Sequence, residues 1–267
     1  MAAKGTEAQY QDFANSSNGQ SSSLNKDLDI NGGGDHVEKP PQRQGTISHV
    51  YQPSFLKAAN PGPLGLISFA VSGFTLALYQ LGVGLPDSNP MGSVGPNQAI
   101  FGLSVFLGGA IQVFAGIMEF RVGNTFGSTL HCIYGGFWLS YGMFFVPALG
   151  IKEAYAGDTH AYTTALGIYL MSWTLITLLF LLAALRTNIA ILSLLFCLML
   201  TFLLLGVAQF IATTATSTAI TVNKAGGGFL VITSLIAFYA GCSGLMVPET
   251  TFIRFPLGDI ESLTRRK

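Results

Sequence analysis

Charged side chains are scarce in this chain. Of its 267 residues only 10% are Asp, Glu, Lys or Arg, against about 25% in soluble domains. Half of the residues are hydrophobic and 20 are Phe, which excludes an ordinary soluble domain and predicts a protein that crosses a membrane several times. The formal net charge is zero, so no basic field indicates a nucleic-acid partner.

Residues for catalysis or metal binding are also few. The three cysteines, Cys132, Cys197 and Cys242, lie in apolar segments without Cys-x-x-Cys spacing. We expect them to be small buried hydrophobes rather than ligands or disulfide partners. The sequence has no acidic cluster that could hold a metal, and no nucleotide-binding or hydrolase motif in a usable context. It therefore predicts a protein that is not an enzyme and needs no cofactor or metal.

Hydrophobic runs are absent from residues 1–53, which are rich in Ser, Asn, Gln and Gly. This composition predicts a disordered polar tail, and no apolar run after Met1 indicates a cleaved signal peptide. We expect the remainder to divide into a transmembrane domain at residues 54–250 and a short C-terminal tail at residues 251–267.

Six apolar segments make up the expected transmembrane domain, each near the roughly 20 residues needed to cross a bilayer. The predicted spans are about residues 64–85, 98–118, 125–146, 162–185, 189–211 and 226–247. A Thr-rich stretch before the last span is expected to be a loop. The predicted fold class is an all-α membrane protein with six transmembrane helices.

Lysine and arginine are unevenly divided between the two predicted faces of the membrane. The basic residues of one face are Lys57, Arg121, Arg186, Arg254, Arg265, Arg266 and Lys267. Those of the other face are Lys152 and Lys224. Because cytoplasmic loops collect positive charge, we expect both termini to lie in the cytoplasm.

An asparagine precedes the first, third and fifth spans, at Asn60, Asn124 and Asn188, with separations of 64 and 64 residues. Asparagine is a good N-cap, because its side-chain oxygen accepts from a backbone N–H that the helix leaves unpaired. Pro61 and Pro63 suit the first turn after Asn60, and we expect free N–H groups at that helix end. Such an end is either a well-capped membrane helix or a place where a pore attracts an anion.

Three large side chains follow these asparagines by nine or ten residues, namely Phe69, Tyr134 and Leu198. At about 1.5 Å per residue they lie about 15 Å deep, near the middle of a hydrocarbon core of about 30 Å. Three large side chains at one level either close a pore or pack in the ordinary way.

Polar side chains inside the predicted spans are few, and such groups are costly in lipid. Glu119 ends the second span near Arg121, which is typical of an interfacial ion pair or of a site for ion or proton uptake. Gln112 lies two turns deeper on the same face and needs a neighbouring helix or a solute as partner. His131 either suits proton coupling or is neutral and bonded to a backbone carbonyl. Further hydroxyl and amide partners are Tyr79, Tyr134, Tyr169, Tyr239 and Gln209.

The segment at residues 60–66, Asn-Pro-Gly-Pro-Leu-Gly-Leu, resembles the Asn-Pro-Ala-Pro-Leu-Gly-Leu signature of the acetate uptake transporters. This family, also called succinate–acetate permeases, includes fungal acetate and ammonia-export proteins. The resemblance continues in order and spacing through residues 106–120, 123–127 and 134–138. The long polar N-terminal tail is similar to that of the fungal members.

This resemblance implies a plasma-membrane, multi-pass permease for acetate and similar short monocarboxylates that moves protons with its substrate. It also implies a homo-hexamer in the lipid bilayer, with a pore through each protomer. The implied hydrophobic constriction consists of Phe69, Tyr134 and Leu198. The implied substrate pathway includes Asn60, Gln112, Glu119 and Asn124. Glu119 and His131 are the candidates for proton coupling.

Two positions depart from the family pattern. Gly62 replaces the usual alanine, and His131 begins a segment where relatives carry hydroxyl-bearing residues, so His131 could give this chain its own pH response.

Two other functions stay open. One alternative function is an ammonium or ammonia exporter, for which Glu119 would attract the cation. The other is a membrane sensor or regulator that transports nothing and signals through its polar tail.

Overall fold

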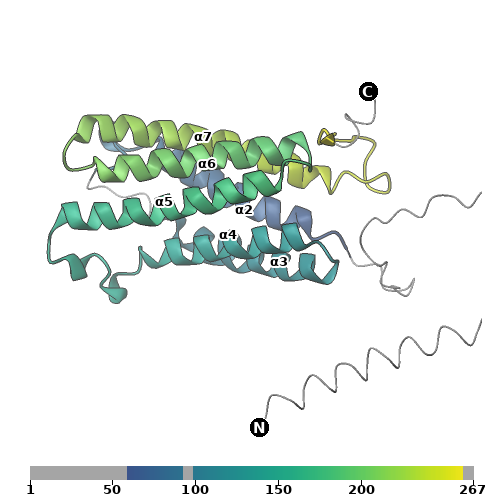
Figure 1. Ribbon diagram of the computed structural model, residues 1–267, viewed down its shortest axis with the longest axis horizontal. Helices are drawn as coiled ribbons and strands as arrows, with labels where there is room; N and C mark the ends of the chain where they lie inside the picture. The colour runs from purple at the N-terminus through teal and green to yellow at the C-terminus, as the bar shows by residue number, and fades with distance from the viewer. Residues whose placement is uncertain (1–58, 93–98, 261–267) are drawn as a thin grey trace, which may run out of the picture. The chain divides into compact units, whose positions relative to one another are not determined.

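Long helices lie side by side in the part of the chain that the structure describes (Figure 1). The computed structural model describes residues 59–92 and 99–260, so the tail expected at residues 1–53 lies outside the described residues. The long helices are α2 (Gly62–Gln80), η3 (Leu103–Ile111) continuing into α3 (Gln112–Arg121), α4 (Thr125–Met143), α5 (Thr159–Ala183), α6 (Ile189–Phe210) and α7 (Thr216–Ser243). Short helical turns lie in the connections at η1 (Pro86–Ser88), η4 (Pro147–Leu149) and η5 (Glu153–Tyr155).

The prediction of an all-α protein with six transmembrane helices is confirmed. Five helices of the described residues are long and apolar enough to cross a membrane, with η3 and α3 counted together. The sixth, α4, also has 19 residues but is more polar. It buries nine of its 19 residues, whereas α5 buries five of 25. Because α4 is enclosed by protein rather than lipid, it does not need a uniformly apolar surface.

The helices pack in the order of the chain and close on themselves. Each helix contacts the next from α2 to η3 and α3, then α4, and again from α5 to α6 and α7, and α7 packs back against α2. The remaining junction, between α4 and α5, is made by aromatic side chains: Phe126 and Tyr134 both contact Phe180 edge-on. The helices therefore surround a central space whose wall is aromatic on the α4–α5 side.

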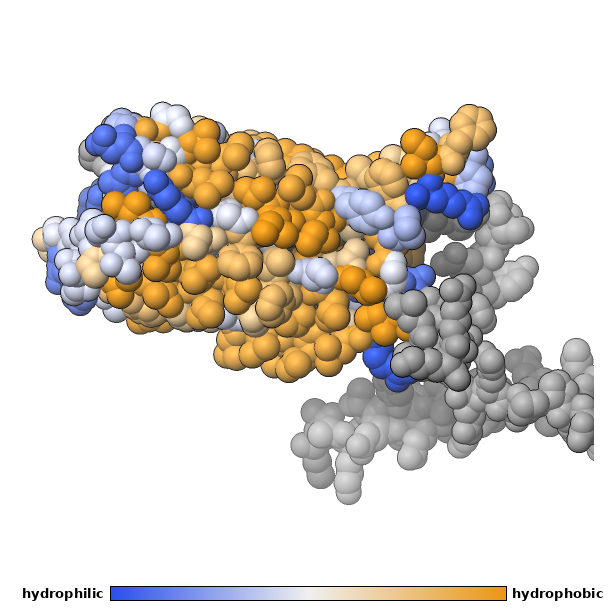
Figure 2. All heavy atoms as spheres, turned by 90° about the horizontal axis from the view of Figure 1, so that it is seen from above, coloured by the Kyte–Doolittle hydropathy of each residue, from blue (hydrophilic) through white to orange (hydrophobic). Residues whose placement is uncertain are grey.

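Apolar side chains cover the outside of the helices as well. On the face drawn in Figure 2, hydrophobic residues occupy the middle of the helical domain and hydrophilic residues gather near its ends. Phe106 and Phe120, on η3 and α3, are 69% and 73% exposed, and Leu175 on α5 is 60% exposed. An apolar surface of this kind is stable against lipid or against another protein, but not against water.

One predicted boundary is wrong by ten residues. The last helix begins at Thr216 rather than near residue 226, and the Thr-rich stretch is helical. The hydroxyls of Thr216 and Thr221 donate to the carbonyls of Ala212 and Ser217, four residues earlier, at 2.9 and 3.2 Å. Ser217 belongs to α7, whereas Ala212 lies in the turn before it. This back-bonding satisfies each hydroxyl locally, so a threonine run remains compatible with a membrane helix.

Residues after α7 return to the start of α6. The N–H groups of Ile189 and Ala190 donate to the carbonyls of Gly258 and Leu257 at 3.0 and 3.2 Å. The hydroxyl of Tyr239 donates to the Pro256 carbonyl at 2.8 Å. The described part of the expected C-terminal tail therefore supplies acceptors for N–H groups that the first turn of α6 cannot pair internally.

Close contact between α4 and its neighbours depends on glycine. A Cβ atom at Gly135 would lie 2.5 Å from Val113 Cγ2 and 3.0 Å from the Val113 backbone nitrogen. A Cβ atom at the adjacent Gly136 would meet nothing within 4 Å. One face of α4 therefore touches backbone, as is common where membrane helices approach closely.

Gly135→Ala should destabilise the protein by about 1–3 kcal/mol, the usual cost of overpacking. Gly136→Ala is the matched control, because its methyl group enters open space and alanine loses less conformational entropy than glycine in a helix. Thermal unfolding of both variants in detergent micelles measures the difference. Equal midpoints would contradict the contact between α4 and the helix formed by η3 and α3.

Candidate solute pathway

A cavity of about 500 Å³ enters the bundle from the end where α5 and α7 begin. We call it the outer cavity. Its rim includes Lys152, Thr159 and Thr216, and it extends inward as far as Phe69 and Leu198. Its volume falls within the range usual for small-molecule sites. The space can therefore hold a small solute together with water.

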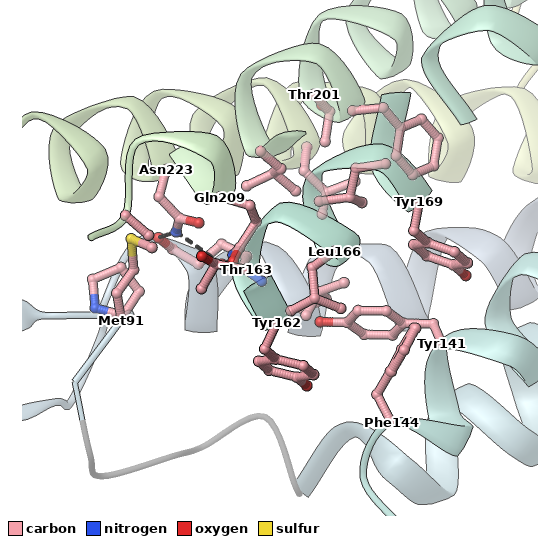
Figure 3. Close-up of a pocket in the computed structure, with 18 of the residues that line it drawn as sticks. Met91, Tyr141, Phe144, Tyr162, Thr163, Leu166, Tyr169, Thr201, Gln209 and Asn223 are labelled. Carbon is pink, nitrogen blue, oxygen red and sulfur yellow. Dashed lines mark hydrogen bonds between the residues drawn. The ribbon is translucent and has the colours of Figure 1, made fainter. Parts of the chain in front are cut away.

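Hydroxyl and amide groups line the outer part of this cavity. Figure 3 shows Tyr162, Thr163 and Tyr169 from α5, Gln209 from α6 and Asn223 from α7 around it. Tyr169 was expected as a hydroxyl partner, and its hydroxyl lies 2.7 Å from Ser140 Oγ on α4. Such groups replace part of the hydration shell of a polar solute.

A buried amide pair joins α7 to α2 beside the outer cavity. The side-chain nitrogen of Asn223 donates to the Gln80 side-chain oxygen at 2.8 Å and to the Gln80 carbonyl at 3.0 Å. Asn223 is 2% and Gln80 is 8% exposed. Sequence reasoning missed both residues, because Asn223 fell in the expected loop and Gln80 at the end of an apolar run.

An apolar layer ends the outer cavity. The structure brings together Phe69 from α2, Tyr134 from α4 and Leu198 from α6, all at most 5% exposed. The ring centroids of Phe69 and Tyr134 are 6.1 Å apart, and the indole of Trp138 is 6.3 Å from Phe69. We call Phe69, Tyr134 and Leu198 the midplane layer.

A second, much smaller cavity lies on the other side of this layer. It holds about 10 Å³, about the space of one water molecule, and we call it the inner cavity. Phe69 and Leu198 line both cavities, so these two side chains separate them. Its lining consists of Leu66, Phe69, Gln112, Leu130, His131, Tyr134, Leu194 and Leu198.

Two polar atoms in the residues that line the inner cavity are buried without a partner. Gln112 Oε1 and His131 Nδ1 make no hydrogen bond among the described residues, and their residues are 1% and 4% exposed. The imidazole packs on Gly65, where a Cβ atom would lie 2.5 Å from Nδ1. Leaving one such atom without a hydrogen bond costs about 1–3 kcal/mol of stability. Two such atoms at one cavity therefore do not serve stability and need another explanation.

The expected pathway residues Asn60, Glu119 and Asn124 lie at the end of the bundle opposite the rim of the outer cavity. Asn124 Nδ2 donates to Glu119 Oε2 at 2.8 Å. A Cβ atom at Gly62 would lie 3.2 Å from both Asn60 Oδ1 and Glu119 Oε1. Glu119 is 3% exposed and uses an amide partner, while Arg121 is exposed. The three residues therefore form one polar cluster, and neither cavity reaches it.

The expectation of free N–H groups at the start of α2 is wrong. The Gly62 N–H donates to Asn60 Oδ1 at 3.1 Å, and the Leu64 and Gly65 N–H groups donate to the Pro61 carbonyl at 3.1 and 3.3 Å. Proline has no N–H to offer. In the described first turn, Asn60 and the prolines therefore leave no backbone donor for an anion.

The other two asparagines cap their helices. Asn124 Oδ1 accepts from the Gly127 N–H at 3.0 Å, and Asn188 Oδ1 accepts from the Ile191 N–H at 2.9 Å. Tyr239 lies apart from both cavities, because its hydroxyl contacts the C-terminal segment at Pro256. The predicted caps at Asn124 and Asn188 are confirmed.

These features define a multi-pass helical membrane protein with a polar cavity that reaches an apolar layer inside the bundle. Residues 44–261 match the GPR1/FUN34/yaaH family, and the chain belongs to this family. The family resemblance and the expectation that the chain is not an enzyme are thereby confirmed.

Two curated relatives are similar over most of this chain. Ammonia transport outward protein 2 of Saccharomyces cerevisiae is 36% identical over 74% of this chain and 65% of its own length. Acetate permease A of Emericella nidulans is 34% identical over 75% of this chain and 66% of its own length. The chain thus spans slightly less than two thirds of each relative.

The fold is also similar to that of a solved structure. The bacterial acetate channel SatP is 28% identical, with a TM-score of 0.59, over 76% of this chain and 100% of the SatP chain. The likeness extends over the whole bacterial chain, so the helical domain is the shared part.

Asn124→Ala should lower the free energy of unfolding by about 2–4 kcal/mol, because it removes a helix cap worth about 1 kcal/mol and the partner of a buried carboxylate. Asn188→Ala is the control, since its side chain caps Ile191 alone, and it should cost about 1 kcal/mol. Denaturant titration in micelles compares the two. If Asn124→Ala lowers the free energy of unfolding no more than Asn188→Ala does, the hydrogen bond from Asn124 to Glu119 does not stabilise the protein.

Proposed function

We propose that this chain is a plasma-membrane permease for acetate and similar short monocarboxylates, which cross the midplane layer with a proton. The observation that carries the proposal is a polar cavity that ends at Phe69 and Leu198, with a second cavity directly beyond them. The names of the relatives support the substrate, since they include an acetate permease and an acetate channel.

The charge at the outer cavity favours an anion over ammonium. Lys152 is the only formally charged side chain among the described residues that line it. A cationic rim raises the local concentration of carboxylate and lowers that of ammonium. Glu119, which would have to attract ammonium, lies outside both cavities and is bonded to Asn124. Because a relative is named for ammonia transport, ammonium belongs in the test as a competitor.

The apolar layer favours the neutral acid as the crossing species. Phe69 and Leu198 offer no hydrogen bond, and moving an isolated carboxylate into such surroundings costs many kcal/mol. A protonated acid has no net charge to desolvate. On this account Gln112 Oε1 and His131 Nδ1, both unpaired at the inner cavity, meet the acid after it passes the layer. Glu119 lies outside both cavities, so it does not meet the acid, and its proposed part is limited to accepting the proton at the end of the bundle.

The distribution of basic residues supports the proposed orientation in the membrane. Arg121 is the last residue of α3, and Arg186 and Arg254 follow the ends of α5 and α7, at one end of the bundle. Lys152 and Lys224 lie at the other end. The positive-inside rule therefore supports a topology with both termini in the cytoplasm and the outer cavity open to the outside of the cell. The family resemblance also implies a homo-hexamer, and exposed apolar residues such as Phe106 are available for contacts between its subunits.

Purified protein in liposomes tests this function directly. Uptake of labelled acetate should be fast, should be inhibited by excess propionate, and should be unaffected by excess ammonium. Uptake of labelled ammonium with no acetate uptake would replace the proposal by the export function. A protein that moves neither solute, although correctly folded, would favour the sensor or regulator.

Lys152→Gln should raise the KM for acetate about two- to threefold at low ionic strength, with a smaller effect in about 0.5 M salt, because one surface charge steers the anion and salt screens it. Lys224→Gln is the matched control. Lys224 lies at the same end but bonds to Ser88 at 3.2 Å and does not line the cavity. If both substitutions change the KM for acetate equally, the charge of Lys152 at the cavity rim does not attract the anion.

A further inference from the structure

The hydroxyl of Tyr134 is directed at Thr177, a residue of α5 that lines neither cavity. Tyr134 lines the inner cavity, yet its Oη lies 2.9 Å from Oγ1 of Thr177 on α5, to which it donates. Thr177 is 0% exposed and lines neither cavity. The polar end of the phenol is therefore held away from the space in which a solute would move.

Thr177 is fixed in the acceptor role. Its hydroxyl donates to the Trp173 carbonyl, one turn earlier, at 2.7 Å. A hydroxyl group has one hydrogen, so the bond to Trp173 leaves Oγ1 of Thr177 only its lone pairs for Tyr134. Tyr134 must then be the donor, and its one hydrogen is committed to Thr177.

Aromatic neighbours hold the phenol ring in the same position. The Tyr134 ring lies 5.7 Å from Phe180 and 6.1 Å from Phe69, measured between centroids. Phe180 and Thr177 lie one turn apart on α5, so one stretch of α5 holds both the ring and its hydroxyl. Phe69 and Leu198 have no polar side-chain atom. The midplane layer, as built, presents no hydrogen-bond donor to a solute.

We propose that Thr177 is a positioning residue for the transport reaction: by accepting the Tyr134 hydroxyl, it keeps the midplane layer free of donors and so excludes the carboxylate anion in favour of the undissociated acid. This inference rests on the proposed function and adds to it the residue that determines which protonation state of the substrate crosses. A free phenol donor at this level would stabilise a passing carboxylate, because hydrogen bonds to charged groups are stronger than neutral ones.

The test is Thr177→Val, which removes the acceptor at nearly constant volume, with Thr177→Ser as the control that restores it. Acetate uptake into liposomes is measured at one pH with and without an imposed membrane potential. Wild type and Thr177→Ser should be insensitive to the potential, since a neutral acid carries no charge. In Thr177→Val, acetate uptake with the potential imposed should exceed uptake without it by about tenfold or more, the effect of one hydrogen bond to a charged group.

Tyr134→Phe tests whether Thr177 acts on transport through the Tyr134 hydroxyl. If Thr177 acts through the phenol hydroxyl, then Thr177→Val should change nothing further in a Tyr134→Phe background. A potential-driven flux that appears equally with and without the hydroxyl would overturn the proposal, as would a Thr177→Val protein that transports like wild type. If Thr177→Val does not fold, Thr177→Ala removes the same acceptor and is judged by the same two outcomes. Wild-type protein without any acetate flux would instead contradict the proposed function itself.

Discussion

The packing of Phe69, Tyr134 and Leu198 is the interaction on which the proposed pathway depends. These side chains come from α2, α4 and α6, and Phe69 and Leu198 line the cavities on both sides. Without this contact the outer cavity would continue into the inner one, and a membrane protein with an open aqueous hole would leak ions. With it, the route inside the described bundle is closed by a thin apolar layer.

Some polar side chains around the midplane layer are hydrogen-bonded and others are not. Around it, Tyr134 is bonded to Thr177, and Gln80 to Asn223, so these side chains hold helices together. Gln112 Oε1 and His131 Nδ1 are unpaired although buried. Among the described residues, Trp138 Nε1, beside Phe69, is unpaired as well. In hydrocarbon an unpaired polar atom is costly, and under the proposed function the two unpaired atoms at the inner cavity meet the solute.

Local physics made part of this structure predictable from sequence. The rise per residue of a helix is constant, so counting from Asn60, Asn124 and Asn188 brought three distant side chains to one level. The beginning of α7 was not predictable in this way, because threonine is also common in loops, and the back-bond from Thr221 to Ser217 exists only once the helix has formed. The Gln80–Asn223 pair joins residues 143 apart in the chain, and local patterns carry no information on such a contact.

Acetate uptake by Phe69→Ala and Phe74→Ala proteins in liposomes tests the central claim most directly. Both substitutions remove the same ring from α2, but Phe74 packs against Phe238 at 6.3 Å and lines neither cavity. Phe69→Ala should open the layer, raising acetate uptake severalfold and admitting larger carboxylates such as butyrate. Phe74→Ala should leave both rates near those of wild type. Identical uptake and identical selectivity in the two variants would contradict a barrier at the midplane layer.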